Sequence, residues 1–222
     1  MIKETASTSY PFSFNRWAAT EESTPPLIPI ITLAMFRIYQ IDLLPCNYYN
    51  IGSEMKNIVL TGFMGTGKTA VGKELARLLD MRLIDVDTEI EDSRDMTINE
   101  IFKEFGEPAF REIETDMIRK VARNKQVIIS TGGGAVLKQE NMEILRETGI
   151  IVCLMASPET ILQRTSATDD RPLLQVDNPL EKIRELLDFR KPYYEKADIV
   201  ITTEGKTPLQ IAEEIVEKVK GR

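Results

Sequence analysis

The stretch Gly62-Phe-Met-Gly-Thr-Gly-Lys-Thr69 decides the fold class. It matches the pattern G-x-x-x-x-G-K-[ST], in which a glycine-rich loop turns its backbone N–H groups toward phosphate oxygens. In such a loop the lysine reaches the β- and γ-phosphates, and the final hydroxyl can bind Mg²⁺. An apolar strand at 57–61 precedes the motif, and a helix with apolar residues every three or four positions follows it. This context favours a nucleotide site over the alternative, a glycine-rich turn between a strand and a helix.

Short apolar segments alternate with helical segments through the rest of the chain. They predict further strands at 82–86, 127–130, 150–155 and 199–202. They also predict helices at 97–106, 108–124, 139–148, 158–165, 179–191 and 208–220. Such alternation implies parallel β-α-β units in a three-layer α/β sandwich. Ligands of open α/β sheets bind at the carboxyl ends of the strands, and the candidate motifs lie there.

Composition excludes several classes of protein. The 222 residues carry 28 basic and 35 acidic side chains, a net charge of −7, which argues against a nucleic-acid-coating protein. The lack of histidine removes His-based acid–base catalysis and His-ligated zinc. Two distant cysteines, Cys46 and Cys153, exclude a disulfide framework and fit a reducing cytosol. No apolar run reaches the roughly 18 residues that span a bilayer. We therefore expect a cytoplasmic protein without nucleic-acid or membrane partners.

Residues 1–54 differ from the remainder of the chain. They hold five prolines, no clear helical or strand period, and three basic against five acidic residues. A secretory signal would need a basic first region, and a transit peptide would lack the acidic excess. We interpret 1–54 as an N-terminal extension, either flexible or the result of a misassigned start, with Met55 as the natural first residue. A functional extension is the alternative. Residues 55–222 then form one domain.

Two carboxylates, Asp85 and Asp87, end the second predicted strand. Side chains at positions i and i+2 of a strand point the same way, so we expect the pair to share one pocket. One would lie near Mg²⁺ and the other near an acceptor hydroxyl. Taken alone, the pattern also suits an acidic loop or a helix cap.

Two further motifs point to a bound anion. Arg111 and Glu114 share one helical face, where a surface ion pair is the common alternative to an arginine that clamps a carboxylate. The run Ser130-Thr-Gly-Gly-Gly134 follows the third predicted strand. Its glycines would let a ligand approach the backbone closely, and the alternative is a tight turn.

The polar segment 165–178 lies between two predicted helices, and its length is typical of a lid. Three arginines, Arg164, Arg171 and Arg190, would bring positive charge to a phosphate site. The alternative is that all three are solvated surface residues. All the motifs together have one explanation. ATP lies on the glycine-rich loop, Mg²⁺ lies on a Thr and an Asp, and Asp87 and arginines hold a small anionic acceptor beneath the lid.

Six segments resemble those of shikimate kinases, in the same order: GFMGTGKT, LIDVD, IFKEFGEPAFREIE, STGGGAV, RTSATDDRPLL and RKPYYEKAD. The resemblance covers essentially the whole chain after Met55. It implies a P-loop kinase fold similar to nucleoside monophosphate kinases, with a five-stranded parallel sheet. It also implies a monomer that transfers the γ-phosphoryl group of ATP to the 3-hydroxyl of shikimate in the chorismate pathway to the aromatic amino acids.

By position, the resemblance also assigns residues. Those implied for ATP are Gly65, Thr66, Gly67, Lys68, Thr69, Ala70, Arg164, Arg171 and Pro208, with Arg164 and Pro208 flanking adenine. Those implied for shikimate are Asp87, Arg111, Gly133, Arg190, Glu114, Phe102 and Phe110. Thr69 and Asp85 would position Mg²⁺. The catalytic set would be Asp87 as the base, Lys68, and Arg171 as the lid residue that reaches the phosphates.

The chain departs from the family pattern only mildly. Val86 stands where a threonine is usual, and Cys153 where an aromatic residue is common. Two rival interpretations remain. Another small-molecule kinase, for gluconate or a nucleotide, would share the phosphate loop without keeping Asp87, Arg111 and Arg190 together. A non-catalytic nucleotide-binding relative could lose Lys68 or the aspartates, yet these residues are present.

Overall fold

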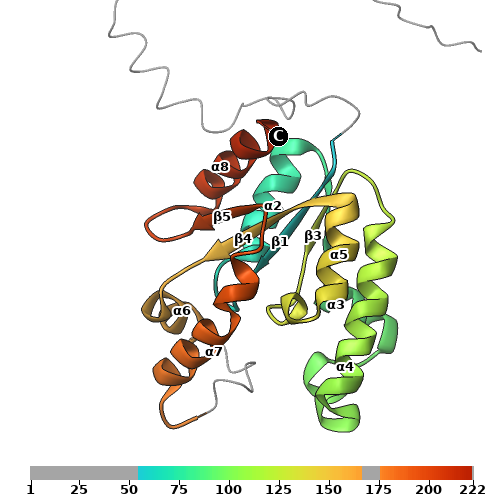
Figure 1. Cartoon of the computed structure of the whole chain (residues 1–222), viewed down its shortest axis with the longest axis vertical. Helices are drawn as coiled ribbons and strands as arrows, with labels where there is room; N and C mark the ends of the chain where they lie inside the picture. Colours follow the sequence, from blue (N-terminus) through green and yellow to red (C-terminus); the bar gives the residue numbers. More distant parts are fainter. Residues whose placement is uncertain (1–54, 167–175, 222) are drawn as a thin grey trace, which may run out of the picture. The chain divides into compact units, whose positions relative to one another are not determined.

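The computed structural model describes residues 55–166 and 176–221. Its strands are β1 (Asn57–Gly62), β2 (Arg82–Asp85), β3 (Val127–Ser130), β4 (Gly149–Met155) and β5 (Ile199–Thr202). Its helices are α2 (Lys68–Leu79), α3 (Val86–Arg94), α4 (Ile98–Ala122), α5 (Gln139–Thr148), α6 (Pro158–Thr165), α7 (Pro179–Tyr194) and α8 (Pro208–Lys220), with a 3₁₀ turn, η1, at Ala135–Leu137. Strands and helices alternate along the chain, as the sequence predicts (Figure 1).

The five strands form one parallel sheet in the order β2-β3-β1-β4-β5. The central strand β1 pairs with β3 on one side and β4 on the other; Leu60, for example, lies opposite both Ser130 and Val152. The chain runs from β1 out to β2, returns through β3, and then crosses β1 to reach β4. This reversal of strand order opens a crevice at the carboxyl ends of β1 and β3, where ligands of open α/β sheets bind.

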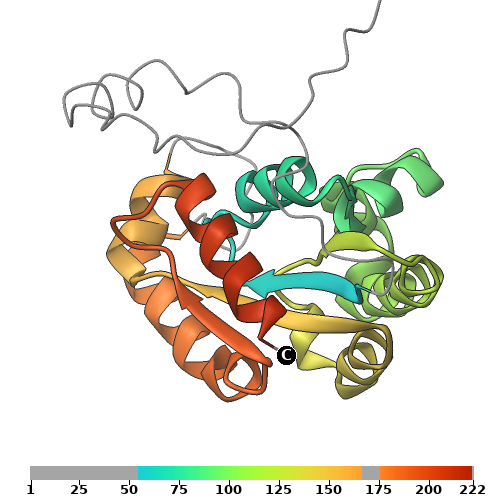
Figure 2. The same ribbon diagram turned by 90° about the horizontal axis from the view of Figure 1, so that it is seen from above.

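Two layers of helices cover the sheet, and the alternation of side chains along the strands explains why. Ile58 and Leu60 of β1 pack with α2 and α8 in one apolar cluster, while Val59 packs with α4 and α5 in the other. In Figure 2, α2 and α8 lie on one side of the sheet and α5 lies on the other. Because α2 follows β1 on one face and α5 follows β3 on the other, the loops after β1 and β3 diverge above the crevice.

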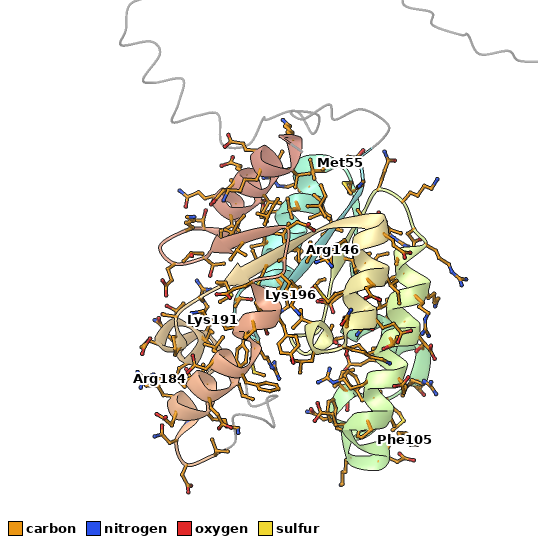
Figure 3. All side chains as sticks on the ribbon, viewed as in Figure 1. Met55, Phe105, Arg146, Arg184, Lys191 and Lys196 are labelled. Carbon is orange, nitrogen blue, oxygen red and sulfur yellow. The ribbon has the colours of Figure 1, made fainter. Side chains whose placement is uncertain are left out.

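Local sequence signals account for the helix boundaries. Thr97 caps α4 and Thr207 caps α8, each in a reciprocal capping box with the residue three positions on. Gly106 interrupts α4 with φ of 80° and ψ of 168°, so the break that the sequence predicts between 106 and 108 is confirmed. Met55, before β1, and Phe105 of α4 lie at opposite ends of the described domain (Figure 3).

The structure corrects two of the predicted elements and adds two that were not predicted. The second strand ends at Asp85, and Val86 already belongs to α3, a helix that the sequence analysis missed. The turn η1 was also missed. Helix α7 continues past the predicted end at Lys191 to Tyr194. It does so through Pro192, whose missing N–H removes one helical hydrogen bond but does not end the helix.

Some predictions lie outside the described residues. These are the interpretation of residues 1–54, the greater part of the predicted lid at 165–178, and the role of Arg171. None of the helices in the described ranges is long and apolar enough to cross a bilayer.

The packing of α8 on the sheet predicts a cost for truncating Ile215, which is fully buried in the cluster that α8 forms with α2 and β1. Ile215→Ala should lower the free energy of unfolding by roughly 2–5 kcal/mol, since it removes buried methyl groups and leaves a cavity. Urea denaturation measures the change. The exposed neighbour Glu213 supplies the control, Glu213→Ala, and equal midpoints for the two variants would contradict the assigned packing.

Candidate active site

The loop between β1 and α2 has the backbone of a phosphate cradle. Gly62, Gly65 and Gly67 all have positive φ angles, of 135°, 75° and 93°. At Gly62 a Cβ would also come within 2.3 Å of the carbonyl oxygen of Leu154, so no other residue fits there. The loop delivers the chain to the N-terminus of α2, where backbone N–H groups and the helix dipole favour an anion.

Polar side chains fix the shape of this loop. Lys68, the first residue of α2, donates from Nζ to the carbonyl oxygens of Gly62 at 2.9 Å and Phe63 at 3.0 Å. Thr66 is buried and donates from its hydroxyl to the same Phe63 carbonyl at 2.8 Å. Thr66 therefore shapes the loop from within, and Lys68 lies across its opening.

A cavity of about 330 Å³ lies at this edge of the sheet. Its lining consists of Met64, Gly65, Gly67, Lys68, Thr69, Ala70, Asp85, Asp87, Ser130, Thr131, Gly133 and Arg164. Most of these residues end or follow β1, β2 and β3, as expected for the crevice where the strand order reverses, and Arg164 comes from α6. Lys68 and Asp87 therefore open onto the same cavity, which a phosphoryl donor and its acceptor must share.

The two aspartates reach this cavity by a route that the sequence analysis did not foresee. They do not alternate along one strand. Asp85 ends β2 and caps α3, and its Oδ1 accepts from the backbone N–H of Asp87 at 3.2 Å. Asp87 then lies in the first turn of α3. The helix cap, which was the alternative, is confirmed for Asp85, and the expectation that both side chains share a pocket holds as well.

Burial and neighbouring charges perturb Asp87. Burial is the largest cause that raises its pKa to about 6, and the carboxylates of Asp85 and Glu114 add to the rise, while Lys68 opposes it. Oδ1 of Asp87 is buried and makes no hydrogen bond within the described residues. A carboxylate with a pKa of about 6 and an oxygen that has no hydrogen-bond partner suits a proton acceptor.

Arg111 and Glu114 of α4 form an ion pair beside the glycines after β3. Nη1 of Arg111 donates to Glu114 at 2.8 Å, and Nη2 donates to Glu107 at 2.9 Å. Glu114 is fully buried, so this is not the surface pair that the spacing alone also allowed. Burial raises the pKa of Glu114, and Arg111 acts against that rise.

The run Gly132–Gly134 makes room for these groups. A Cβ on Gly132 would lie 2.9 Å from oxygens of both Asp87 and Glu114. A Cβ on Gly134 would lie 2.4 Å from Nη2 of Arg111. Close approach therefore explains these glycines. The sequence predicts that a ligand approaches them, but at Gly132 and Gly134 the approaching groups are side chains of the protein itself.

Arg190 of α7 is buried against the same run. Its Nη1 donates to the carbonyl oxygen of Gly133 at 3.3 Å, and its guanidinium lies 5.3 Å from the ring centroid of Phe63. Tyr194 donates to the same carbonyl at 2.9 Å. The sequence analysis missed both Phe63 and Tyr194. The i, i+4 spacing from Arg190 could have revealed Tyr194 if the predicted helix had continued past Pro192.

Arg164 of α6 connects two loops at the side of the cavity. Its Nη1 donates to the hydroxyl of Thr203 at 3.0 Å and to the carbonyl of Gly65 at 3.3 Å. Thr203, after β5, is fully buried and was not predicted. Pro208 begins α8 and is not part of the cavity lining.

Phe102 and Phe110 stack on each other, with ring centroids 4.6 Å apart, and the guanidinium of Arg111 lies 5.2 Å from the Phe110 ring. Neither ring lines the cavity. They pack in the core beneath the Arg111–Glu114 pair.

The fold and the site together define the class of protein. A phosphate loop at the end of the central strand of a five-stranded parallel sheet, open to the same cavity as a partly buried aspartate, is the arrangement of a P-loop kinase of the nucleoside monophosphate kinase-like type. The model of one family, described as shikimate kinase, matches residues 64–220. The chain belongs to the shikimate kinase family.

Individual relatives agree with this assignment. A shikimate kinase of Thermodesulfovibrio yellowstonii is 54% identical over 164 residues, which are 74% of this chain and 95% of that protein. A shikimate kinase of Caldanaerobacter subterraneus is 48% identical over 171 residues, 76% of this chain and 100% of that protein.

Solved structures are similar as well. The shikimate kinase from Acinetobacter baumannii in complex with shikimate has a TM-score of 0.73 and 40% identity, covering 75% of this chain and 94% of that one. The shikimate kinase from Bacteroides thetaiotaomicron has a TM-score of 0.69 and 35% identity, and the match covers 76% of this chain and 100% of that one.

The buried charge of Asp87 predicts a variant that is more stable than the wild type. The folded carboxyl keeps its proton up to about pH 6 and the unfolded one only up to its ordinary value of 3.8, so the charge destabilises the fold increasingly between these values and fully above pH 6. Asp87→Asn should raise the free energy of unfolding at pH 8 by roughly 1–3 kcal/mol, and by less at pH 5. Urea denaturation at both pH values measures this gain.

Asp92 of α3 is exposed and supplies the matched control, Asp92→Asn, which should leave stability unchanged. An Asp87→Asn gain that is absent, or equal at the two pH values, would contradict the described burial.

Proposed function

We propose that this chain catalyses the ATP-dependent phosphorylation of the 3-hydroxyl of shikimate, giving shikimate 3-phosphate for aromatic amino-acid synthesis. The observation that carries the proposal is the single cavity onto which Lys68 and Asp87 both open. Membership of the shikimate kinase family supports the choice of acceptor. The chain is then a transferase, a kinase that binds ATP as its phosphoryl donor.

ATP would bind through the loop and the start of α2. The backbone N–H groups of 65–70 would hold the phosphates, and Lys68 would leave the carbonyls of Gly62 and Phe63 for phosphate oxygens. Arg164, which already borders the cavity, would lie beside adenine with Pro208 opposite. Arg171 would add positive charge from the lid.

Mg²⁺ fits the residues at the start of α2. The Thr69 hydroxyl lies 3.4 Å from Oδ2 of Asp85, and both border the cavity. Mg²⁺ is commonly held by one or two protein oxygens together with substrate phosphates, so Thr69 and Asp85 would suffice. When bound, the ion would neutralise charge on the phosphates.

Shikimate would lie between the glycine run and Asp87. Arg111 and Arg190 would hold its carboxylate, Glu114 would orient Arg111, and Gly133 would support the ring, with Phe102 and Phe110 behind. Asp87 would accept the proton of the 3-hydroxyl while the hydroxyl oxygen attacks the γ-phosphorus of ATP. The bond between the γ-phosphorus and the oxygen that bridges it to the β-phosphorus would break, which releases ADP. The raised pKa of Asp87 supports this role.

The proposal extends to a monomer in the cytoplasm with small molecules as its only partners. The net charge of −7 supports the lack of nucleic-acid partners. We also propose that residues 1–54 are dispensable for the reaction.

An acceptor panel tests the proposed substrate. With ATP and Mg²⁺, the purified chain should phosphorylate shikimate at least tenfold faster, in kcat/KM, than gluconate or a nucleoside monophosphate. The control is the same panel without Mg²⁺, in which turnover should be lost. Preference for gluconate or a nucleotide would rule out the proposed acceptor.

A second test concerns the base. Asp87→Asn should lower kcat on shikimate by about 10²–10⁴-fold, because the hydroxyl proton loses its acceptor. The affinity for ATP, measured by calorimetry, should change less than twofold. Near-normal turnover in this variant would exclude Asp87 as the base.

The domain assignment has its own test. A chain of residues 55–222 should fold cooperatively and show the kcat and KM of the full chain within a factor of two. Loss of activity or of solubility would assign a function to residues 1–54 instead.

A further inference from the structure

We propose that Tyr194 is a positioning residue for the acidic substrate: its hydroxyl holds the carbonyl of Gly133 and so leaves Arg190 available for the substrate carboxylate. The inference rests on the proposed function, in which Arg190 binds that carboxylate. It adds a residue to the site that sequence reasoning did not reach.

Arg190 and Tyr194 lie four residues apart on α7, so they share one face of the helix. This face is buried, with 5% exposure at Arg190 and 1% at Tyr194. Arg184 and Lys191 belong to the outer face of α7, where their side chains are 48% and 63% exposed (Figure 3). Tyr194 reaches the site only because α7 continues through Pro192.

Both side chains donate to one acceptor. The hydroxyl of Tyr194 lies 2.9 Å from the Gly133 carbonyl oxygen, and Nη1 of Arg190 lies 3.3 Å from it. A carbonyl oxygen can accept both, and the tyrosine bond is the shorter. Burial raises the pKa of Tyr194 to about 12, so the hydroxyl keeps its proton and remains a donor at neutral pH.

The Nε of Arg190 has no partner. It is buried and makes no hydrogen bond to any residue of the described ranges. A buried donor without a partner is costly, and a carboxylate can accept two parallel N–H bonds from an arginine. The Nε edge is therefore where the substrate carboxylate would bind, while Nη1 faces Gly133.

Tyr194 matters because the Gly133 backbone lies close to the phosphate loop. A Cβ on Gly133 would lie 3.3 Å from the carbonyl oxygen of Gly62 and 3.4 Å from the N of Met64. When Arg190 turns to a substrate, its long bond to the Gly133 carbonyl weakens. Tyr194 keeps that buried carbonyl satisfied. Without the hydroxyl, the carbonyl and the substrate would compete for Arg190.

The variant Tyr194→Phe tests this inference, since it removes one oxygen and keeps the packed ring. Calorimetry should show the Kd for shikimate raised about tenfold, equivalent to about 1.4 kcal/mol, and the KM for shikimate should rise in parallel. The KM for ATP should stay within a factor of two. The control is Tyr193→Phe, whose ring packs against Phe189 and Lys196 and which should bind shikimate normally.

The methyl ester of shikimate separates positioning from a general structural role. Because the ester lacks the charge that Arg190 would bind, the wild type and Tyr194→Phe should bind it equally well. Equal loss for shikimate and its ester, or no loss for either, would overturn the inference. A wild-type chain that fails to bind shikimate would overturn the proposed function as well. If the wild type binds and phosphorylates shikimate and Tyr194→Phe binds shikimate just as well, this inference alone would be overturned.

Discussion

The close approach of the backbone after β3 to its neighbours is the constraint on which the site depends. Each of three consecutive glycines faces different neighbours: Gly132 faces Asp87 and Glu114, Gly133 faces the phosphate loop and Arg190, and Gly134 faces Arg111. A side chain at Gly132 or Gly134 would push these groups apart. The glycine run thus lies against the phosphate loop, Asp87 and both arginines; Asp87 and Gly133 line the cavity, and Arg111 and Arg190 contact the run from outside its lining.

The cost of this arrangement appears in the electrostatics. Glu114 and the partly buried Asp87 both lie close to Gly132, and each has one buried oxygen that has no hydrogen-bond partner within the described part of the chain. Lys68 and Arg111 offset part of this cost, because Lys68 lowers the pKa of Asp87 and Arg111 lowers that of Glu114. Buried charges of this kind destabilise a fold, and they are typical of sites where substrate charge completes the pairing.

Sequence reasoning reached the fold because its evidence was local. The phosphate loop, the five strands and the capping box at Thr97 each depend on residues a few positions apart. The errors also have local causes. The predicted second strand included Val86, which is β-branched. In the structure Asp85 caps α3, and Val86 is the first residue of that helix. Pro192 suggested a helix end, yet α7 continues to Tyr194. Contacts such as Arg190 with Phe63 or Arg164 with Thr203 join distant segments, and no pattern in the sequence predicts them.

The central claim is that one cavity holds the nucleotide phosphates and the acidic acceptor together. A crystal structure with ADP and shikimate tests it most directly. The account predicts phosphates on the backbone of 65–69, the shikimate carboxylate between Arg111 and Arg190, and its 3-hydroxyl within hydrogen-bond distance of Asp87. Shikimate bound away from Asp87, or nucleotide bound away from Lys68, would contradict the account.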